Sequence, residues 1–302
     1  MYSQLKTHKH AIRELRLAAP ISAAATVQPA QALTAADTQE VLSFLRIRPV
    51  HTIVMTSLIL DNGIESELNR GTFFGYRNTK GELEGVALIG HSTLVEARSD
   101  EALASLAAAA RKPSVPIHMI MSGGDTAERF YDLMTDGRSE PRLKCEEALF
   151  EASFPYLVRE CTWKLENATM ADLLSVAEAQ AEVAFIECGV DPMARDREGF
   201  LKRVARRIEQ NRVFVVRDGD KMVFKADIIS ETEDAAYLEG IYVPPDYRGR
   251  GVAAECLSRL TLQLLDRVDN ICLLSNVDFG YAHKSFEKAG YRRTDQCVTL
   301  FV

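Results

Sequence analysis

The residues best suited to chemistry lie in one stretch near the C-terminus, LEGIYVPPDYRGRGVA, residues 238–253. Its first part has the β-branched and aromatic composition of a strand, two prolines end any ladder, and a helical pattern of apolar residues follows. The free backbone N–H groups of the loop and the positive end of the helix dipole converge, so the sequence predicts an anion-binding site at the start of the helix. Gly249 and Gly251 let the backbone approach an oxygen-rich ligand, and Arg248 and Arg250 add positive charge.

Three interpretations of this stretch compete. The first is a plain helix-capping turn. The second is a dinucleotide fingerprint, because Gly249, Gly251 and Ala254 have its spacing. That motif follows its strand directly and leads to an acidic residue ~20 positions on, whereas here non-strand residues intervene and the next strand ends in Leu-Ser-Asn, residues 274–276. The third is a cradle for the pyrophosphate of coenzyme A.

The third interpretation rests on a family resemblance. Residues 248–253, RGRGVA, resemble the Arg/Gln-x-x-Gly-x-Gly/Ala motif of the GNAT N-acyltransferase superfamily. The preceding EGIYV-x-P and the following FEKAGY, residues 286–291, resemble that superfamily too, so the likeness covers about residues 160–302. It implies acetyl-CoA or another acyl-CoA as co-substrate. It also implies an α/β fold with a central mixed, mostly antiparallel sheet flanked by helices.

The resemblance also assigns positions. It implies that backbone groups of the strand pair with the pantetheine arm and the thioester carbonyl, while the loop anchors the coenzyme. The residues expected to bind the coenzyme are Ile241, Tyr242, Val243, Arg248, Gly249, Arg250, Gly251, Val252, Ala253, Asn276 and Phe286. For Asn276 the alternative is a purely structural role, ending a strand at a turn.

Glu239 is the candidate general base. It is the one carboxylate on a strand otherwise built from apolar and aromatic residues, and the family often carries a catalytic or amine-contacting acid at this place. Partial burial would raise its pKa and improve it as a base. Two alternatives stay open: contact with an acceptor's ammonium group without proton transfer, and an ordinary solvated strand residue.

The chain departs from the family at the general acid. The C-terminal helix of the family usually carries Ala-x-x-x-Tyr, and here Ala282 is followed by Phe286 at the tyrosine's place. Phenylalanine cannot donate a proton. Tyr281 is the nearest candidate for that role. Alternatively, coenzyme A leaves as the thiolate, or the domain binds acyl-CoA without turning it over.

The length of 302 residues suggests two domains, and the expected elements repeat. The expected helices are 34–60 with a break at Pro49, 99–111, 127–134, 171–188, 195–210, 252–267 and 280–289; the expected strands are 71–77, 82–90, 91–97, 117–121, 161–165, 213–217, 222–230, 236–243, 271–275 and 293–302. The same order therefore occurs twice, about 145 residues apart.

The repeat predicts a tandem protein. We expect an extension over 1–33, a degenerate GNAT-like domain over 34–150, a boundary near residues 145–160 and a catalytic GNAT domain over 160–302. The first copy has EARSDE, residues 96–101, where the second has its glycine-rich loop, so it should not bind a phosphate.

Composition argues against several classes of partner and ligand. A net charge of −7, with no basic stretch outside one helix, argues against nucleic acid as a partner. No apolar run reaches the ~20 residues that span a bilayer. Six cysteines without zinc or C-x-x-C spacing read as reduced core thiols of a cytoplasmic protein. We expect no metal, since His8 and His10 are isolated.

The sequence thus predicts an acetyl-CoA-dependent N-acetyltransferase acting on a primary amine of a small molecule or amino acid, as a monomer or homodimer. The alternatives are an acyl-CoA sensor without turnover and a protein N-acetyltransferase. The basic helix 195–210 is expected to be a solvated face, with an anionic acceptor or the coenzyme's 3′-phosphate as the alternative partner.

Overall fold

The computed structural model describes residues 28–157 and 159–302. Its strands are β1 (Gln31–Ala32), β2 (Gly71–Arg77), β3 (Leu83–Gly90), β4 (Ser92–Ala97), β5 (Met119–Gly123), β6 (Leu143–Ser153), β7 (Glu166–Asn167), β8 (Val213–Asp218), β9 (Lys221–Glu231), β10 (Ala235–Tyr242), β11 (Asn270–Asn276) and β12 (Arg292–Phe301). Its helices are α2 (Thr38–Leu45), α3 (Ile53–Asn62), α4 (Asp100–Ala109), α5 (Thr126–Thr135), α6 (Leu173–Cys188), α7 (Pro192–Arg195), α8 (Arg197–Glu209), α9 (Val252–Leu265) and α10 (Gly280–Lys288). Short 3₁₀ turns are η1 (Ala35–Asp37), η2 (Glu67–Asn69), η3 (Met170–Asp172) and η4 (Pro245–Tyr247).

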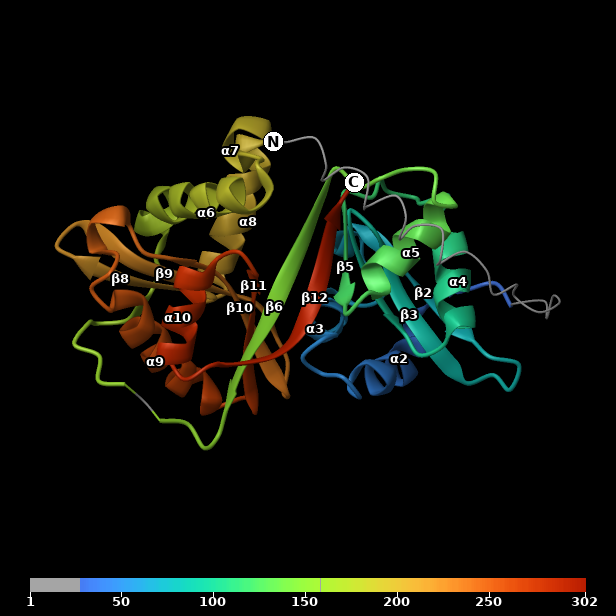
Figure 1. The fold of residues 1–302 in the computed structure, drawn as a ribbon, viewed down its shortest axis with the longest axis horizontal. Coiled ribbons are helices and arrows are strands. Elements are labelled where there is room, and N and C mark those ends of the chain that lie inside the picture. The colour runs from blue at the N-terminus through green and yellow to red at the C-terminus, as the bar shows by residue number, and fades with distance from the viewer. Residues whose placement is uncertain (1–27, 158) are drawn as a thin grey trace, which may run out of the picture.

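One mixed sheet runs through both halves of the molecule, in the order β1-β2-β3-β4-β5-β12-β6-β11-β10-β9-β8-β7 (Figure 1). Among the described strands, β4 pairs in parallel with β5 and β10 with β11, whereas the other neighbouring strands pair antiparallel. The predicted mixed, mostly antiparallel sheet flanked by helices is confirmed. The repeated element order is confirmed as well, since the series from α2 to β6 recurs from α6 to β12.

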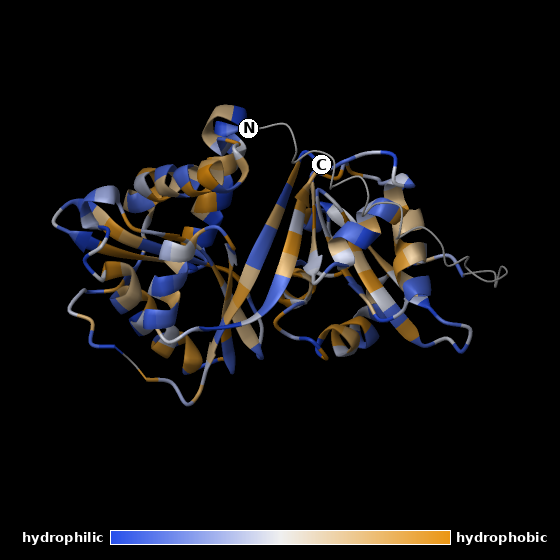
Figure 2. Cartoon of the chain, viewed as in Figure 1, coloured by the Kyte–Doolittle hydropathy of each residue, from blue (hydrophilic) through white to orange (hydrophobic). Residues whose placement is uncertain are grey.

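The two halves exchange their last strands. β6 belongs to the first repeat but pairs with β11 of the second, and β12 belongs to the second but pairs with β5 of the first. β6 and β12 also pair with each other, and they lie side by side across the middle of the molecule in Figure 1. In Figure 2 polar and apolar residues are interspersed along β6, whereas β12 begins with polar residues and ends with mostly apolar ones. Strand pairing therefore crosses the predicted boundary between the halves.

The sequence analysis missed β6 and placed a boundary there instead. The strand reads LKCEEALFEAS, and its glutamates are residues that strands usually avoid. Two of them are tolerated because alternate residues face different surroundings: Ala148, Phe150 and Ala152 are buried in the core of the second half. Glu147 and Glu151 lie on the opposite face, where they accept hydrogen bonds from Thr299 and Thr294. The domain limits of 34–150 and 160–302 remain a prediction.

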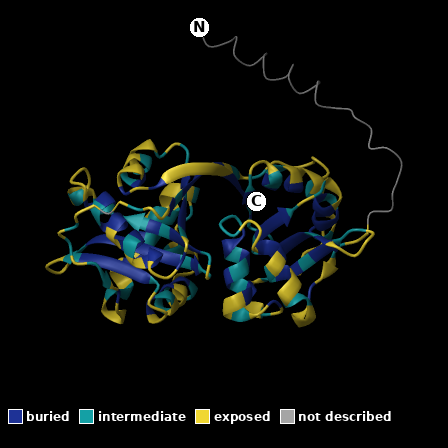
Figure 3. Ribbon diagram, turned by 90° about the horizontal axis from the view of Figure 1, so that it is seen from below, coloured by how far each residue is buried: buried dark blue, intermediate teal, exposed yellow. Residues whose placement is uncertain are grey.

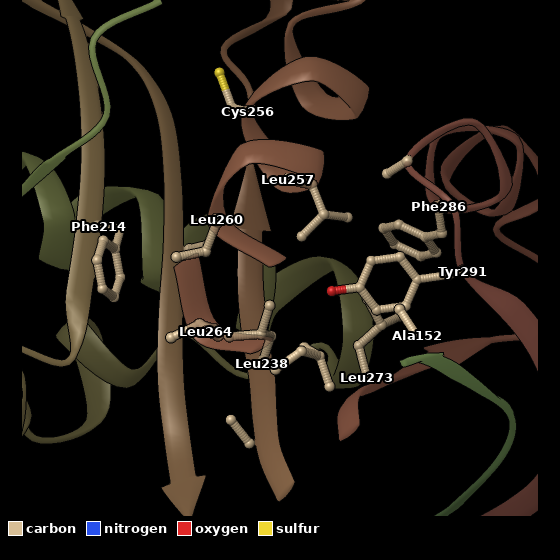
Figure 4. Packing of buried hydrophobic residues seen from close by; sticks show 14 of the residues in the cluster. Ala152, Phe214, Leu238, Cys256, Leu257, Leu260, Leu264, Leu273, Phe286 and Tyr291 are labelled. Atoms are coloured by element: carbon tan, nitrogen blue, oxygen red, sulfur yellow. The ribbon is translucent and has the colours of Figure 1, made fainter. Parts of the chain in front are cut away.

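Helices cover both faces of the sheet, and buried strands form the interior of both lobes in Figure 3. In the second half α9 and α10 pack on one face, where Leu257, Leu260 and Leu264 meet Leu238 (Figure 4). Helices α6 and α8 form a separate apolar cluster with β8. The first half repeats this plan with α4 and α5 in one cluster and α2 and α3 in another. Helix α3 also joins the halves, because Ile53 packs with Leu149 and Tyr237.

Two sequence predictions need correction. The strand expected at 161–165 is irregular chain, and the short strand β7 follows it. Trp163 of this segment packs against the core, which explains its apolar composition. Within the expected extension, residues 31–32 form β1, and the backbone N–H of Ala30 donates to Ser105 Oγ at 2.7 Å. His8 and His10 lie outside the described residues.

Among residues 28–157 and 159–302, every helix is too short or too polar to cross a bilayer.

Candidate active site

The predicted site residues surround a cavity of about 500 Å³ in the second half. Strands β10 and β11 pair in parallel up to Leu238 and Leu273 and then part. The cavity opens beyond that point, between β10, the start of α9 and α10. The predicted residues that line it are Glu239, Ile241, Tyr242, Val243, Arg248, Gly249, Gly251, Val252, Ala253, Tyr281 and Phe286. A separate hollow of about 620 Å³, between residues 159–165 and α9, contains none of the predicted site residues.

A β-bulge in β10 shapes the cavity wall. Glu239 pairs with Asp227 and Tyr242 with Lys225, so two residues of β10 lie opposite the single residue between them on β9. The bulge includes Gly240, whose φ is 60°. A Cβ there would lie 2.5 Å from the Lys225 ammonium nitrogen, so another side chain does not fit without a shift. Such a bulge leaves a backbone group unpaired and re-aims the neighbouring side chains.

The glycine-rich loop forms an open cradle at the start of α9. Gly249 and Gly251 have φ of 77° and 88°, the left-handed region that suits glycine. Gly251 is the N-cap of α9, and no side chain caps the helix. A Cβ on Gly249 would meet no atom within 4 Å, so the space beside this residue is open. The first N–H groups of α9 are therefore available to an anion, which fits the pyrophosphate of coenzyme A.

The two arginines of the loop have different places. Arg248 donates from Nε to the carbonyl of Val243 at 2.9 Å and lies 3.5 Å from Glu182, so it ties the loop to the end of β10. The guanidinium of Arg250 stands 5.4 Å from the ring centre of Tyr247. Arg250 is not among the residues that line the cavity.

The equivalent helix of the first half is closed to anions. Ser99 caps α4 by accepting from the N–H of Ala102 at 3.2 Å. The same hydroxyl donates to Glu84 at 2.7 Å, and Asp100 and Glu101 form the first turn. A capping side chain and the carboxylates of Glu84, Asp100 and Glu101 thus lie at the start of α4, whereas no side chain caps α9.

Glu239 is half-buried and lies among charged groups. Burial raises the pKa of Glu239 above its ordinary value. The positive charges of Arg207 and Lys225 lower this pKa, and the negative charge of Asp227 raises it further. Two further carboxyls face the same region. Desolvation, with the charges of Glu239 and Glu147, raises the pKa of Glu187 to about 8.

Glu147 of β6 completes this group of carboxyls. Burial raises the pKa of Glu147 as well, although Thr299 Oγ1 donates to it. Because β6 belongs to the first repeat and α6 and β10 to the second, the acidic side of the site is assembled from both halves. A raised pKa suits a group that accepts a proton near neutral pH.

The remaining predicted residues differ in exposure. Tyr281 lines the cavity with a side chain that is 69% exposed. Phe286 is buried, and its ring centre lies 5.5 Å from that of Phe150, so it belongs both to the cavity wall and to the core. Asn276 lies outside the cavity lining; its side-chain oxygen accepts from the N–H of Asp278 at 2.9 Å and closes the turn after β11.

Sequence reasoning missed three charged residues of the site. Lys225 and Asp227 are fully buried on β9, and Glu147 lies on the unpredicted β6. A signal for the first two exists in the sequence: charges two residues apart interrupt the apolar run MVFKADII, so both point to one face of a buried strand. In the described part of the chain, no group of three or more metal-ligating side chains is placed to hold a metal ion.

Comparison with known proteins identifies the domain. Residues 209–293 match the family model for the acetyltransferase (GNAT) domain. The second half of the chain carries a GNAT domain. The matched residues contain the bulge, the glycine-rich loop and Tyr281.

Solved structures extend the fold of the GNAT domain to most of the chain. A GNAT-family acetyltransferase from Colwellia psychrerythraea has a TM-score of 0.58 at 13% identity, over 91% of this chain and 99% of that one. A GCN5-related N-acetyltransferase from Sphaerobacter thermophilus has a TM-score of 0.60 at 14% identity, over 90% and 94%. A tandem GNAT protein from the clavulanic acid biosynthesis pathway has a TM-score of 0.55 at 11% identity, over 90% and 97%. These similarities show the tandem fold. No curated protein matches the sequence.

Proposed function

We propose that the protein transfers an acetyl group from acetyl-CoA to a primary amine, by direct attack of the amine on the thioester. The observation that carries the proposal is the open, glycine-lined N-terminus of α9 beside a β10 that has parted from β11. The half-buried Glu239 on the same strand supplies the base. The closed N-terminus of α4 in the first half supports one coenzyme site per chain.

We assign a group of this chain to each step of the proposed reaction. The N–H groups of the loop and of α9 hold the pyrophosphate, and free amides of the bulged strand polarise the thioester carbonyl. Glu239 removes the proton from the attacking ammonium. The carboxyls of Glu187 and Glu147 lie on the same side, and because their pKa values are raised they attract a cationic amine only at a pH at which they are ionised. This acidic side favours a small amine over an anionic acceptor.

Tyr281 is our proposed donor of a proton to the leaving thiolate. It lines the cavity, while Phe286 occupies the place that a phenol usually has in the family. We expect Tyr281→Phe to lower kcat about tenfold, less than a buried acid would, because water also reaches this exposed side chain. The measurement is thiol release at saturating acetyl-CoA and amine. Unchanged kcat across the pH range would assign the proton to solvent.

The test of the function combines binding and turnover. Calorimetric titration with acetyl-CoA should give one site per chain, and thiol release should appear with at least one member of a panel of small primary amines. The rival is an acyl-CoA sensor, favoured by the phenylalanine at position 286. Tight binding without thiol release, for every small amine and for lysine-containing peptides, would support the sensor.

A further inference from the structure

The second half of the molecule buries an ion pair beneath the bulge. Lys225 and Asp227 have no exposed surface, and the ammonium nitrogen of Lys225 lies 2.9 Å from a carboxylate oxygen of Asp227. The other oxygen of Asp227 lies 3.6 Å from Nε of Arg207 on α8. Removing two charges from water is costly, and well-packed apolar residues in place of a buried ion pair often give equal or greater stability. Stability of the fold alone therefore does not explain the pair.

The repeat supplies an internal comparison for these positions. In the second half Ile228 pairs with Leu238, the last residue of β10 in register with β11. In the first half Leu88 pairs with Leu94, the last residue of β4 in register with β5. The two pairs are therefore equivalent points, from which the neighbouring residues of both repeats can be counted.

Counting from those points, the first half has no charges where the second has three. Asp227 corresponds to Ala87 and Lys225 to Gly85 on the partner strand, while Glu239 corresponds to Val95. The pairing of β3 with β4 continues without a register shift, whereas that of β9 with β10 shifts after Glu239. The ion pair, the bulge and the candidate base thus occur together, in the half that has the open phosphate cradle.

The contacts of Lys225 connect the pair to the bulge. Its ammonium group donates to the carbonyl oxygen of Gly240 at 3.1 Å and to Oε1 of Gln180 on α6. Lys225 thus connects Gly240, the bulge residue with positive φ, to helix α6. A buried charged donor forms a strong hydrogen bond. It can therefore stabilise an irregular stretch of backbone that lacks the regular hydrogen bonds between strands.

We propose that the Lys225–Asp227 pair is a positioning device: Lys225 fixes the bulge at Gly240, and thereby aims Glu239 and the free amides of β10 at the reacting thioester. Asp227 is needed because an isolated ammonium group would not stay charged in this position. The kinetic part of this inference rests on the proposed function; the structural part does not.

The charges that face Glu239 make the proposal testable by pH. They come from β9 (Lys225, Asp227), α8 (Arg207), α6 (Glu187) and β6 (Glu147). Lys225 lowers the pKa of Glu239 and Asp227 raises it. Loss of the lysine charge should therefore move the acid limb of the rate profile to higher pH, and loss of the aspartate charge to lower pH. Opposite shifts would show that both charges act on Glu239, and hydrogen exchange at the bulge tests whether the pair also positions it.

The experiment uses Lys225→Met, Asp227→Asn and the double variant in the full chain. The double variant decides the test if a single variant does not fold, because it leaves no uncompensated buried charge. Lys221→Met is the matched control, since Lys221 is an exposed lysine at the start of the same strand. The readouts are amide hydrogen exchange of residues 239–243, the Kd for coenzyme A, and kcat against pH.

We expect the double variant to exchange amides 239–243 at least tenfold faster, with residues 71–97 of the first half unchanged. Its kcat should fall about 100-fold, since misplacing reacting groups by 1 Å can have that effect. The Kd for coenzyme A should change less than kcat, because the pyrophosphate cradle at the start of α9 stays intact. The single variants should shift the acid limb in opposite directions. If the amide exchange rates and the acid limb of the pH profile equal those of Lys221→Met, the inference is wrong. If the unmodified protein acetylates no amine, the proposed function fails, and the exchange measurement alone decides this inference.

Discussion

Glu239→Gln should lower turnover ~10²–10⁴-fold, because glutamine keeps the shape of the side chain but cannot accept a proton from the attacking amine. Coenzyme A binding should stay the same, since the carboxylate belongs to the acceptor side of the cavity and the phosphate cradle to the start of α9. The measurement is kcat from thiol release, with Kd for coenzyme A from calorimetry.

The pH dependence gives a second readout for Glu239. Burial raises its pKa, so the carboxylate is protonated at a higher pH than an ordinary glutamate. Activity should therefore be full above that pKa and be lost as the pH falls through it, and Glu239→Gln should abolish this limb. Glu209→Gln, at an exposed position on α8, is the control and should leave kcat and the limb unchanged. If Glu239→Gln turns over at the unmodified rate, Glu239 is not the base. It then either contacts the acceptor's ammonium group without proton transfer or is an ordinary solvated strand residue.

Gly249→Ala combined with Gly251→Ala should weaken coenzyme A binding about 100-fold. Both glycines have positive φ, where another residue costs about 1–3 kcal/mol each, and relieving that strain would rotate the N–H groups away from the phosphates. A Cβ on Gly251 would also lie 3.2 Å from Glu255. Loss of roughly 3 kcal/mol corresponds to about 100-fold weaker binding. Calorimetry and the rise in Tm with millimolar coenzyme A measure the effect.

Gly219→Ala is the matched control for the loop. Gly219 lies in the turn between β8 and β9 with φ of 60°, and a Cβ there would also meet no atom within 4 Å. It therefore introduces similar backbone strain away from the cavity, and coenzyme A should bind as in the unmodified protein. Equal coenzyme A affinity in the loop variant and in this control would contradict the phosphate cradle and with it the proposed function.

The sequence alone predicted most of the local elements, although it missed β6 and placed a strand at 161–165 where the chain is irregular. The strand, two prolines, glycine-rich turn and apolar helix at 238–265 were readable because each step is a short-range preference: ladder geometry, fixed proline φ and glycine's freedom. The acidic residues at the start of the first half's equivalent helix likewise predicted that it binds no phosphate. The repeat was visible because its elements recur in order.

Only the tertiary structure decided how the site is assembled. That β6 and β12 change places between the halves depends on pairing between strands over a hundred residues apart, which no local pattern encodes. The exchange brings Glu147 of the first repeat to the carboxyls of the second. The register shift opposite Lys225 depends on β9 as well as β10, so the role of a buried ion pair beneath Gly240 emerged only once both strands were aligned.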